Sequence, residues 1–139
     1  MILLDTNVLS ALMREQPDVE VIQWLDRQPR TSVWTTAITV FEIRFGLQSM
    51  AAGKRRTALI AAFDHLVANL IQERIAHFDN AAAQAAADLM AERQKQRRSG
   101  ELRDTMIAGI VLATHATLAT RNTKHFEDIA AYVVNPWGA

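Results

Sequence analysis

Three carboxylic acids of this chain lie where an isolated surface charge is not expected. Asp5 directly follows an apolar run, Glu42 lies within an apolar segment, and Asp104 begins the most apolar helical segment of the sequence. Two carboxylates about 4 Å apart repel each other by about 4 kcal/mol at an effective dielectric constant of about 20. If the three side chains converge, either their pKa values rise or a cation neutralises them. Because carboxylate oxygens are hard ligands, the favoured cation is Mg²⁺ or Mn²⁺.

A site of this kind can hydrolyse a phosphodiester bond, because a bound divalent ion activates water and stabilises the leaving oxygen. The protein then supplies no nucleophile of its own. Other catalytic patterns are missing from the sequence, which has no Cys, no GxSxG elbow, no P-loop and no GxGxxG, and whose His residues form no HExxH pair. The residue types therefore favour metal-dependent hydrolysis.

Each carboxylate also has a purely structural explanation. Asp5 and Asp104 could each cap the helix that follows, and Glu42 could be a solvated residue on a partly exposed helix. Against this, all three fall at expected strand ends or first helical turns, where an α/β sheet gathers its ligand site. The residues alone leave both explanations open.

The segments that must position these acids alternate between strand-like and helix-like patterns. Strands are predicted over residues 2–4, 32–39, 74–78, 117–120 and 132–134, and helices over 6–13, from Pro17 to just before Pro29, and over 39–50, 54–70, 80–98 and 104–115. Strands separated by helices imply parallel pairing with crossover connections, and an almost wholly apolar helix is typical of a sheet covered on both faces. The prediction is an α/β fold, namely a three-layer α/β/α sandwich with a central parallel sheet of about five strands.

The size and composition of the chain predict a single domain over residues 1–139. No stretch approaches the roughly 20 apolar residues that a membrane helix requires, so no membrane partner is expected. The N-terminus lacks the basic segment typical of a signal peptide, and the absence of Cys fits a reducing compartment. We therefore expect a cytoplasmic protein.

The formal net charge is zero, so any binding of nucleic acid must depend on a local basic patch. Two runs qualify, namely residues 93–98 together with Arg103, and residues 54–56. The first run could instead be a solvated helix end, where cations suit the helix dipole. Arg103 adjoins Asp104 and is the better candidate for contact with a phosphate or with the acidic site.

Five blocks of the chain, taken together, resemble one known family in order and spacing. They are LLDTNVL at 3–9, VFEIRFG at 40–46, RDTMIA at 103–108, LATRN at 118–122 with Phe126, and VNPW at 134–137. In this combination they resemble the PIN domain, and in particular the toxin ribonucleases of bacterial type II toxin–antitoxin pairs, of the VapC and FitB kind. The resemblance covers nearly the whole chain.

The resemblance implies a PIN-like fold, dependence on Mg²⁺ or Mn²⁺, and endonucleolytic cleavage of RNA. It also implies a homodimer and a cognate antitoxin protein that blocks the site. An apolar groove for an antitoxin helix is expected from Leu12, Met13, Phe41, Phe45 and Leu47.

Site residues are carried over from the resemblance by position. The acidic cluster that would hold the metal is Asp5, Glu42 and Asp104, with Asn122 completing the catalytic set. Residues on the substrate side would be Thr6, Asn7, Arg103 and Arg121.

The last block departs from many relatives, which often have a fourth acid there. This chain has Asn122, and His125 stands where an Asp often precedes the Phe. Asn can orient water or a metal ligand but adds no charge, so we expect one ion held by Asp5 and Asp104, with Glu42 direct or through water. The alternatives are a catalytically weak PIN-like RNA-binding or regulatory module, or a phosphatase, whose DxD-type motif would need a second acid in place of Asn7.

Overall fold

The computed structural model describes residues 1–138 and has a five-stranded parallel sheet at its centre. The strand order is β3-β2-β1-β4-β5, so the chain builds one side of the sheet outward from β1 and then returns to build the other side. The strands are β1 (Ile2–Leu4), β2 (Val33–Thr36), β3 (Ile75–Ala76), β4 (Thr117–Ala119) and β5 (Val133–Val134). The point where the strand order reverses, between β1 and β4, is where such sheets bind ligands.

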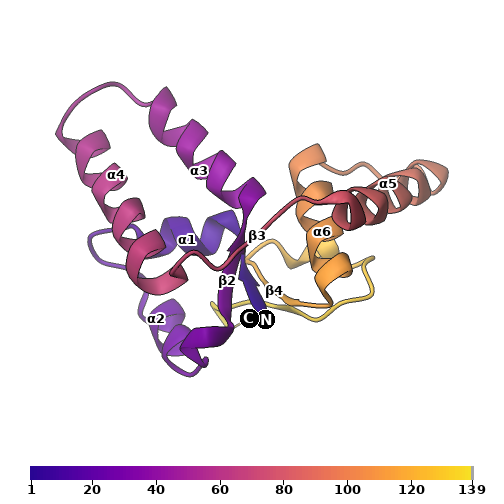
Figure 1. Cartoon of the computed structure of the whole chain (residues 1–139), viewed down its shortest axis with the longest axis horizontal. Coiled ribbons are helices and arrows are strands. Elements are labelled where there is room, and N and C mark those ends of the chain that lie inside the picture. The colour runs from indigo at the N-terminus through magenta and orange to yellow at the C-terminus, as the bar shows by residue number, and fades with distance from the viewer. Residues whose placement is uncertain (139) are drawn as a thin grey trace.

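Helices cover both faces of this sheet. They are α1 (Thr6–Leu12), α2 (Val19–Asp26), α3 (Ala37–Ser49), α4 (Lys54–Leu66), α5 (Asn80–Lys95) and α6 (Leu102–Thr114), with short helical turns η1 (Arg30–Ser32), η2 (Val67–Ile71) and η3 (Thr123–Phe126). Figure 1 shows α1 to α4 on one side of the strands and α5 with α6 on the other. The predicted three-layer α/β/α sandwich is therefore confirmed.

Two hydrophobic cores fill the space between the layers. Because side chains alternate along a strand, Leu4 packs into the core beneath α1 to α4 and Leu3 into the core beneath α5 and α6; both are fully buried. Within residues 1–138 no helix has the length and apolar character needed to cross a membrane.

Two predicted boundaries are wrong for identifiable reasons. The strand predicted over 32–39 ends at Thr36, because the Thr36 hydroxyl accepts a hydrogen bond from the Thr39 amide and so caps α3. The β-branched run that suggested a longer strand is thus partly the first turn of a helix. Pro17 lies before α2 and not within its first turn, since that helix begins at Val19.

Helices α5 and α6 pack together through small residues. A Cβ atom added to Gly109 of α6 would lie 2.5 Å from the Ala82 carbonyl oxygen and 2.7 Å from the Ala86 Cβ atom of α5. The two helices therefore approach as closely as they do because position 109 has no side chain.

We expect Gly109→Ala to reduce the free energy of unfolding by about 1–3 kcal/mol, because the added methyl group must push the helices apart. Urea unfolding followed by circular dichroism measures this. Gly46→Ala on α3 is the matched control, because its added Cβ atom meets nothing within 4 Å and alanine favours the helix by up to about 1 kcal/mol. Equal effects of the two substitutions would contradict the close packing.

Candidate functional site

Asp5 lies at the carboxyl edge of the sheet, at the point where the strand order reverses. Its amide donates to the Ala119 carbonyl oxygen at 2.9 Å, so it continues the pairing of β1 with β4. Its side chain is nearly buried and accepts a 2.8 Å hydrogen bond from the Thr6 amide at the start of α1. Asp5 thus caps α1 and also lines the cavity of the site. The structural and the functional explanation that the sequence left open therefore both apply to it.

The Asp5 carboxylate is in an unfavourable environment for a charge. Burial raises its pKa, and the nearby Asp104 charge raises it further. Hydrogen bonds from the Thr120 hydroxyl (2.7 Å), the Thr6 amide and the Asn7 amide nitrogen (3.4 Å) oppose this without cancelling it. The net result is a raised pKa, so the ionised carboxylate is disfavoured here unless a cation offsets its charge.

Glu42 reaches the same region from α3. The Thr6 hydroxyl donates to its Oε1 atom at 2.9 Å, and Arg103 lies 3.7 Å from its Oε2 atom. Its pKa is raised, mainly by burial and then by Asp5 and Asp104, although Thr6 and Arg103 act in the opposite direction. Glu42 is therefore not the freely solvated residue that the sequence allowed.

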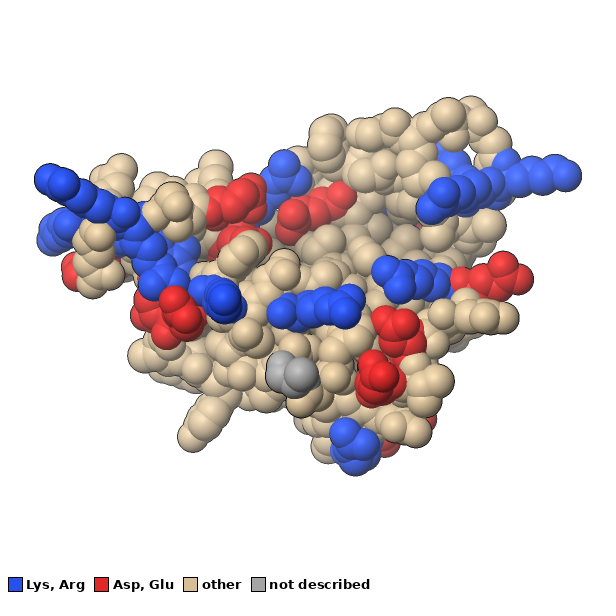
Figure 2. All heavy atoms as spheres, turned by 180° about the vertical axis from the view of Figure 1, so that it is seen from behind, with Lys and Arg blue, Asp and Glu red and all other residues tan. Residues whose placement is uncertain are grey.

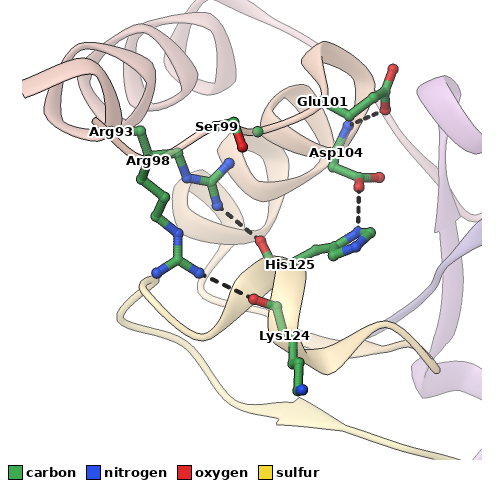
Figure 3. A pocket seen from close by; sticks show the side chains of 8 residues that line it. Arg93, Arg98, Ser99, Glu101, Asp104, Lys124 and His125 are labelled. Atoms are coloured by element: carbon green, nitrogen blue, oxygen red, sulfur yellow. Dashed lines mark hydrogen bonds and ion pairs between the residues drawn. The ribbon is translucent and has the colours of Figure 1, made fainter. Parts of the chain in front are cut away.

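Asp104 is in the first turn of α6 but does not cap it. The Glu101 carboxylate accepts from the Asp104 amide at 3.2 Å and is the cap, which excludes the capping explanation for Asp104. The Asp104 Oδ2 atom instead lies 2.9 Å from the Nδ1 atom of His125. Figure 3 shows the two side chains pointing toward each other.

One cavity of about 420 Å³ brings these acids together. Its lining includes Asp5, Thr6, Asn7, Ser10, Arg14, Glu42, Asp104, Arg121, Asn122 and Trp137. We call it the acidic cavity. Of the residues predicted for the site, only Arg103 is outside this lining, and it reaches the cavity through Glu42. Figure 2 shows acidic side chains grouped near the upper middle of one face, with basic side chains to either side.

The donor set fits a hard divalent cation, but the side chains are not arranged as three ligands of one ion. Within residues 1–138 no three acidic or histidine side chains lie close enough together to hold one. Asp104 is engaged by His125, and Glu42 by Thr6 and Arg103. The pKa values of Asp5 and Glu42 are nevertheless both raised, mainly by burial and further by the other acids, so their ionised forms are disfavoured in this cavity.

The loop after β4 forms the other wall of the acidic cavity. The Asn7 amide oxygen accepts from the Arg121 backbone at 3.0 Å, while the Asn7 amide nitrogen donates to the Thr120 hydroxyl at 3.2 Å. The Arg121 guanidinium lies over the Trp137 ring, 4.7 Å from its centroid. Asn122 donates its backbone N–H to the Thr120 hydroxyl at 3.1 Å.

Two residues of the site were missed or undervalued by sequence reasoning. Thr120 is fully buried and makes the shortest hydrogen bond to Asp5, and it follows β4 just as Asp5 follows β1. The rule that locates ligands at the carboxyl edge could therefore have found it. The sequence showed only that His125 stands where an Asp often precedes the Phe; its side chain is 55% exposed, yet it contacts Asp104.

Comparisons with known proteins identify the family to which this sequence and fold correspond. Residues 2–132 match the sequence profile described as the PIN domain. The chain is 39% identical over 137 residues to the VapC ribonuclease Y4jK of Sinorhizobium fredii, covering 99% of this chain and 98% of that one. It is 34% identical over 137 residues to the toxin FitB of Neisseria gonorrhoeae, covering 99% of each. The crystal structure of FitAcB from Neisseria gonorrhoeae has a TM-score of 0.89 at 34% identity and full coverage of both chains.

Proposed function

Since this chain belongs to the PIN domain family, we propose that it is a metal-dependent endoribonuclease and the toxin of a type II toxin–antitoxin pair. The observation that carries the proposal is the acidic cavity, which Asp5, Glu42 and Asp104 all line from three separate parts of the chain. The similarity to a VapC ribonuclease and to the toxin FitB supports both the reaction and the biological role. We place this activity in the cytoplasm, in one domain over residues 1–139.

Asp5 and Asp104 would hold Mg²⁺ or Mn²⁺, with Glu42 direct or through water. When bound, the ion supplies a more acidic water molecule and stabilises the leaving oxygen of the phosphodiester. The Thr6 amide and the Thr120 hydroxyl both donate to the Asp5 carboxylate. The side chain is therefore held in one orientation before an ion binds.

Other residues of the acidic cavity suit the substrate. Arg14 and Arg121 are the cations of its lining and would bind phosphate oxygens of RNA. Asn7 fixes the Arg121 backbone relative to β1, and Asn122 offers an amide that can orient water without adding charge. Arg103 would hold Glu42 in place.

We expect chelation with EDTA to stop cleavage of a long RNA and excess Mn²⁺ to restore it. Because water is the nucleophile in this proposal, the products should carry no cyclic phosphate, which would arise if the neighbouring ribose hydroxyl attacked. Gel electrophoresis and mass spectrometry of the fragments measure both. Cleavage that persists in EDTA, or fragments that end in a cyclic phosphate, would contradict the mechanism.

This chain has a groove beside the acidic cavity that suits an antitoxin helix. A hollow of about 310 Å³ lies between α1, α3 and α4, and the apolar part of its lining is Met13, Ile43, Leu47 and Leu59. Its polar part includes Arg55, and it shares Thr6, Ser10, Arg14 and Glu42 with the acidic cavity. An amphipathic helix of the antitoxin would bind there and reach the acids. Growth arrest on expression of the chain alone, relieved by the neighbouring reading frame, tests this role.

Three of the five residues expected in that groove are absent from its lining, namely Leu12, Phe41 and Phe45. Leu12 instead packs, partly buried, against the hydrophobic core. Phe41 and Phe45 are 57% and 56% exposed, and their rings stack with centroids 6.2 Å apart on the outer face of α3. They are absent from the lining of the hollow, because helical spacing turns them away from Ile43 and Leu47. We keep the homodimer as a prediction, and this exposed apolar pair is the surface that a second copy would cover.

A catalytically weak RNA-binding module is the second candidate. It is favoured by the engagement of Asp104 with His125 and by an amide instead of an acid at Asn122. RNA binding without cleavage at saturating Mn²⁺ would support it over the nuclease.

A further inference from the structure

A buried cation lies behind Asp104, outside the acidic cavity. Arg93 is 4% exposed and belongs to α5, and it lines a second hollow of about 340 Å³ together with Arg98, Ser99, Gly100, Glu101, Asp104, Lys124 and His125. Figure 3 shows this hollow between the end of α5, the start of α6 and η3. Asp104 lines both hollows. Residues of the second hollow that hold Asp104 in place therefore also affect the acidic cavity.

Arg93 uses its whole guanidinium group. Its Nε and Nη2 atoms each donate to Asp128 at 2.8 Å, Nη2 also donates to the His125 carbonyl oxygen at 3.0 Å, and Nη1 donates to the Thr105 hydroxyl at 3.0 Å. Thr105 is the residue after Asp104, and the His125 ring is bonded to the Asp104 carboxylate. Arg93 therefore contacts both sides of the Asp104–His125 pair.

The charge of Arg93 is already balanced. The pKa of Asp128 is lowered, mainly by its hydrogen bond from Arg93, and Arg98 lies 3.5 Å from the same carboxylate. A cation that is paired in this way and has so little exposed surface cannot also bind a phosphate of RNA. The sequence left two explanations open for the run over 93–98, RNA binding or a solvated helix end, and neither describes the buried Arg93, whose role is internal.

The turn between α5 and α6 makes room for this arrangement. A Cβ atom added to Gly100 would lie 2.9 Å from the Arg93 Nη1 atom and 3.6 Å from the Thr105 hydroxyl. The backbone thus approaches the guanidinium as closely as it can at this position. The Arg93 guanidinium also donates four hydrogen bonds. Together with the Gly100 backbone, these contacts fix its position.

We propose that Arg93 is a positioning residue, which fixes the orientation of the Asp104 carboxylate by holding the His125 backbone and Thr105. The inference rests on the proposed function, because it assumes that Asp104 binds a divalent ion. Groups that hydrogen-bond to a metal ligand typically change metal affinity by about 10–100-fold when mutated. Arg93 acts one step further back, through the residue that makes this hydrogen bond.

A double-mutant cycle on Mn²⁺ affinity tests the proposal, with isothermal titration calorimetry on the full chain. We expect Arg93→Lys to weaken Mn²⁺ binding by about 10-fold or more, because lysine cannot reach Asp128, Thr105 and the His125 carbonyl together. In a His125→Ala background the same change should weaken Mn²⁺ binding by less than about threefold, because the contact of the His125 ring with Asp104 is lost and only the contact through Thr105 remains. An equal effect in both backgrounds would overturn the proposal.

The matched control is Arg98→Gln. It also removes a cation beside Asp128, but its other contacts are the Lys124 carbonyl and Glu127 and not His125. We expect its Mn²⁺ affinity to stay within about twofold of the wild type, even if stability falls. An affinity loss equal to that of Arg93→Lys would mean that any damage to this region weakens the site.

Two further outcomes separate the possible failures. If Arg93→Lys does not fold, Gly100→Ala displaces the same guanidinium and keeps its charge; unchanged Mn²⁺ affinity in that variant would overturn the positioning role. If the wild type itself binds no Mn²⁺, the proposed metal dependence fails, whereas a wild type that binds while Arg93→Lys binds equally well refutes only this inference.

Discussion

Asp5→Asn is expected to lower the rate of RNA cleavage by more than about 100-fold, because even groups that merely hydrogen-bond to a metal ligand contribute 10–100-fold. The same substitution should not destabilise the protein when divalent ions are absent. Asparagine retains an oxygen that can accept from the Thr6 amide, and it removes a charge that is nearly buried and repelled by Asp104. Loss of activity without loss of stability would distinguish a metal ligand from a simple helix cap.

The pH dependence of this effect has a defined sign. The pKa of Asp5 is raised above its ordinary value of 3.8, mainly by burial. The protonated carboxyl group therefore stabilises the fold fully below pH 3.8, and this contribution is lost as the pH rises through the raised value. Asp5→Asn should accordingly gain stability relative to the wild type as the pH increases from 4 towards 7.

Thermal unfolding in EDTA across this pH range, together with RNA cleavage in Mg²⁺, measures both effects. Asp88→Asn is the control, since Asp88 is an exposed acid of α5 and its replacement should change neither quantity. A large fall in the unfolding temperature of Asp5→Asn at pH 7 would show that capping outweighs the charge, and would contradict the account.

Asp128→Asn is expected to cost about 3 kcal/mol of folding free energy, because it leaves the buried Arg93 guanidinium without its counter-charge. Asp128 receives two 2.8 Å hydrogen bonds from Arg93, and its side chain is only 16% exposed. Its pKa is lowered, so its contribution is present above pH 3.8 and is lost as the pH falls through the lowered value. The difference between variant and wild type should therefore shrink in acid.

Urea unfolding at pH 7 and in strong acid measures this difference. Asp64→Asn is the matched control, because Asp64 pairs with Arg44 at the same 2.8 Å distance but with both side chains about half exposed. An exposed pair contributes at most about 1 kcal/mol. If the two substitutions cost the same at pH 7, the pair between Asp128 and Arg93 is not the stabilising contact that the geometry indicates.

The carboxylates could be predicted as site candidates from the sequence because the pattern that distinguishes them, an acid next to an apolar segment, is local. Asp5 ends an apolar strand, and the rule for parallel sheets places such a residue at the ligand edge whatever the details of packing. Glu42 and Asp104 were predicted as members of the cluster from their apolar surroundings and from the resemblance. Their presence in one cavity depends on how α3 and α6 pack, which the three-layer prediction anticipated only in outline.

The contacts behind the site could not be predicted in the same way. Arg93 and Asp128 are separated by 35 residues, and neither lies in a pattern that distinguishes a buried ion pair from a solvated one. The cap of α6 is Glu101 and not Asp104, although both are acids that precede the apolar run. Such choices depend on tertiary distances that single-sequence patterns do not contain.

The central claim is that Asp5, Glu42 and Asp104 share one divalent ion, and a crystal soaked in Mn²⁺ tests it most directly. The account predicts an anomalous-scattering peak inside the acidic cavity, in contact with Asp5 and Asp104 and with Glu42 direct or through water. A well-ordered crystal with no such peak, whose three carboxylates point to separate partners as Asp104 does to His125, would contradict it.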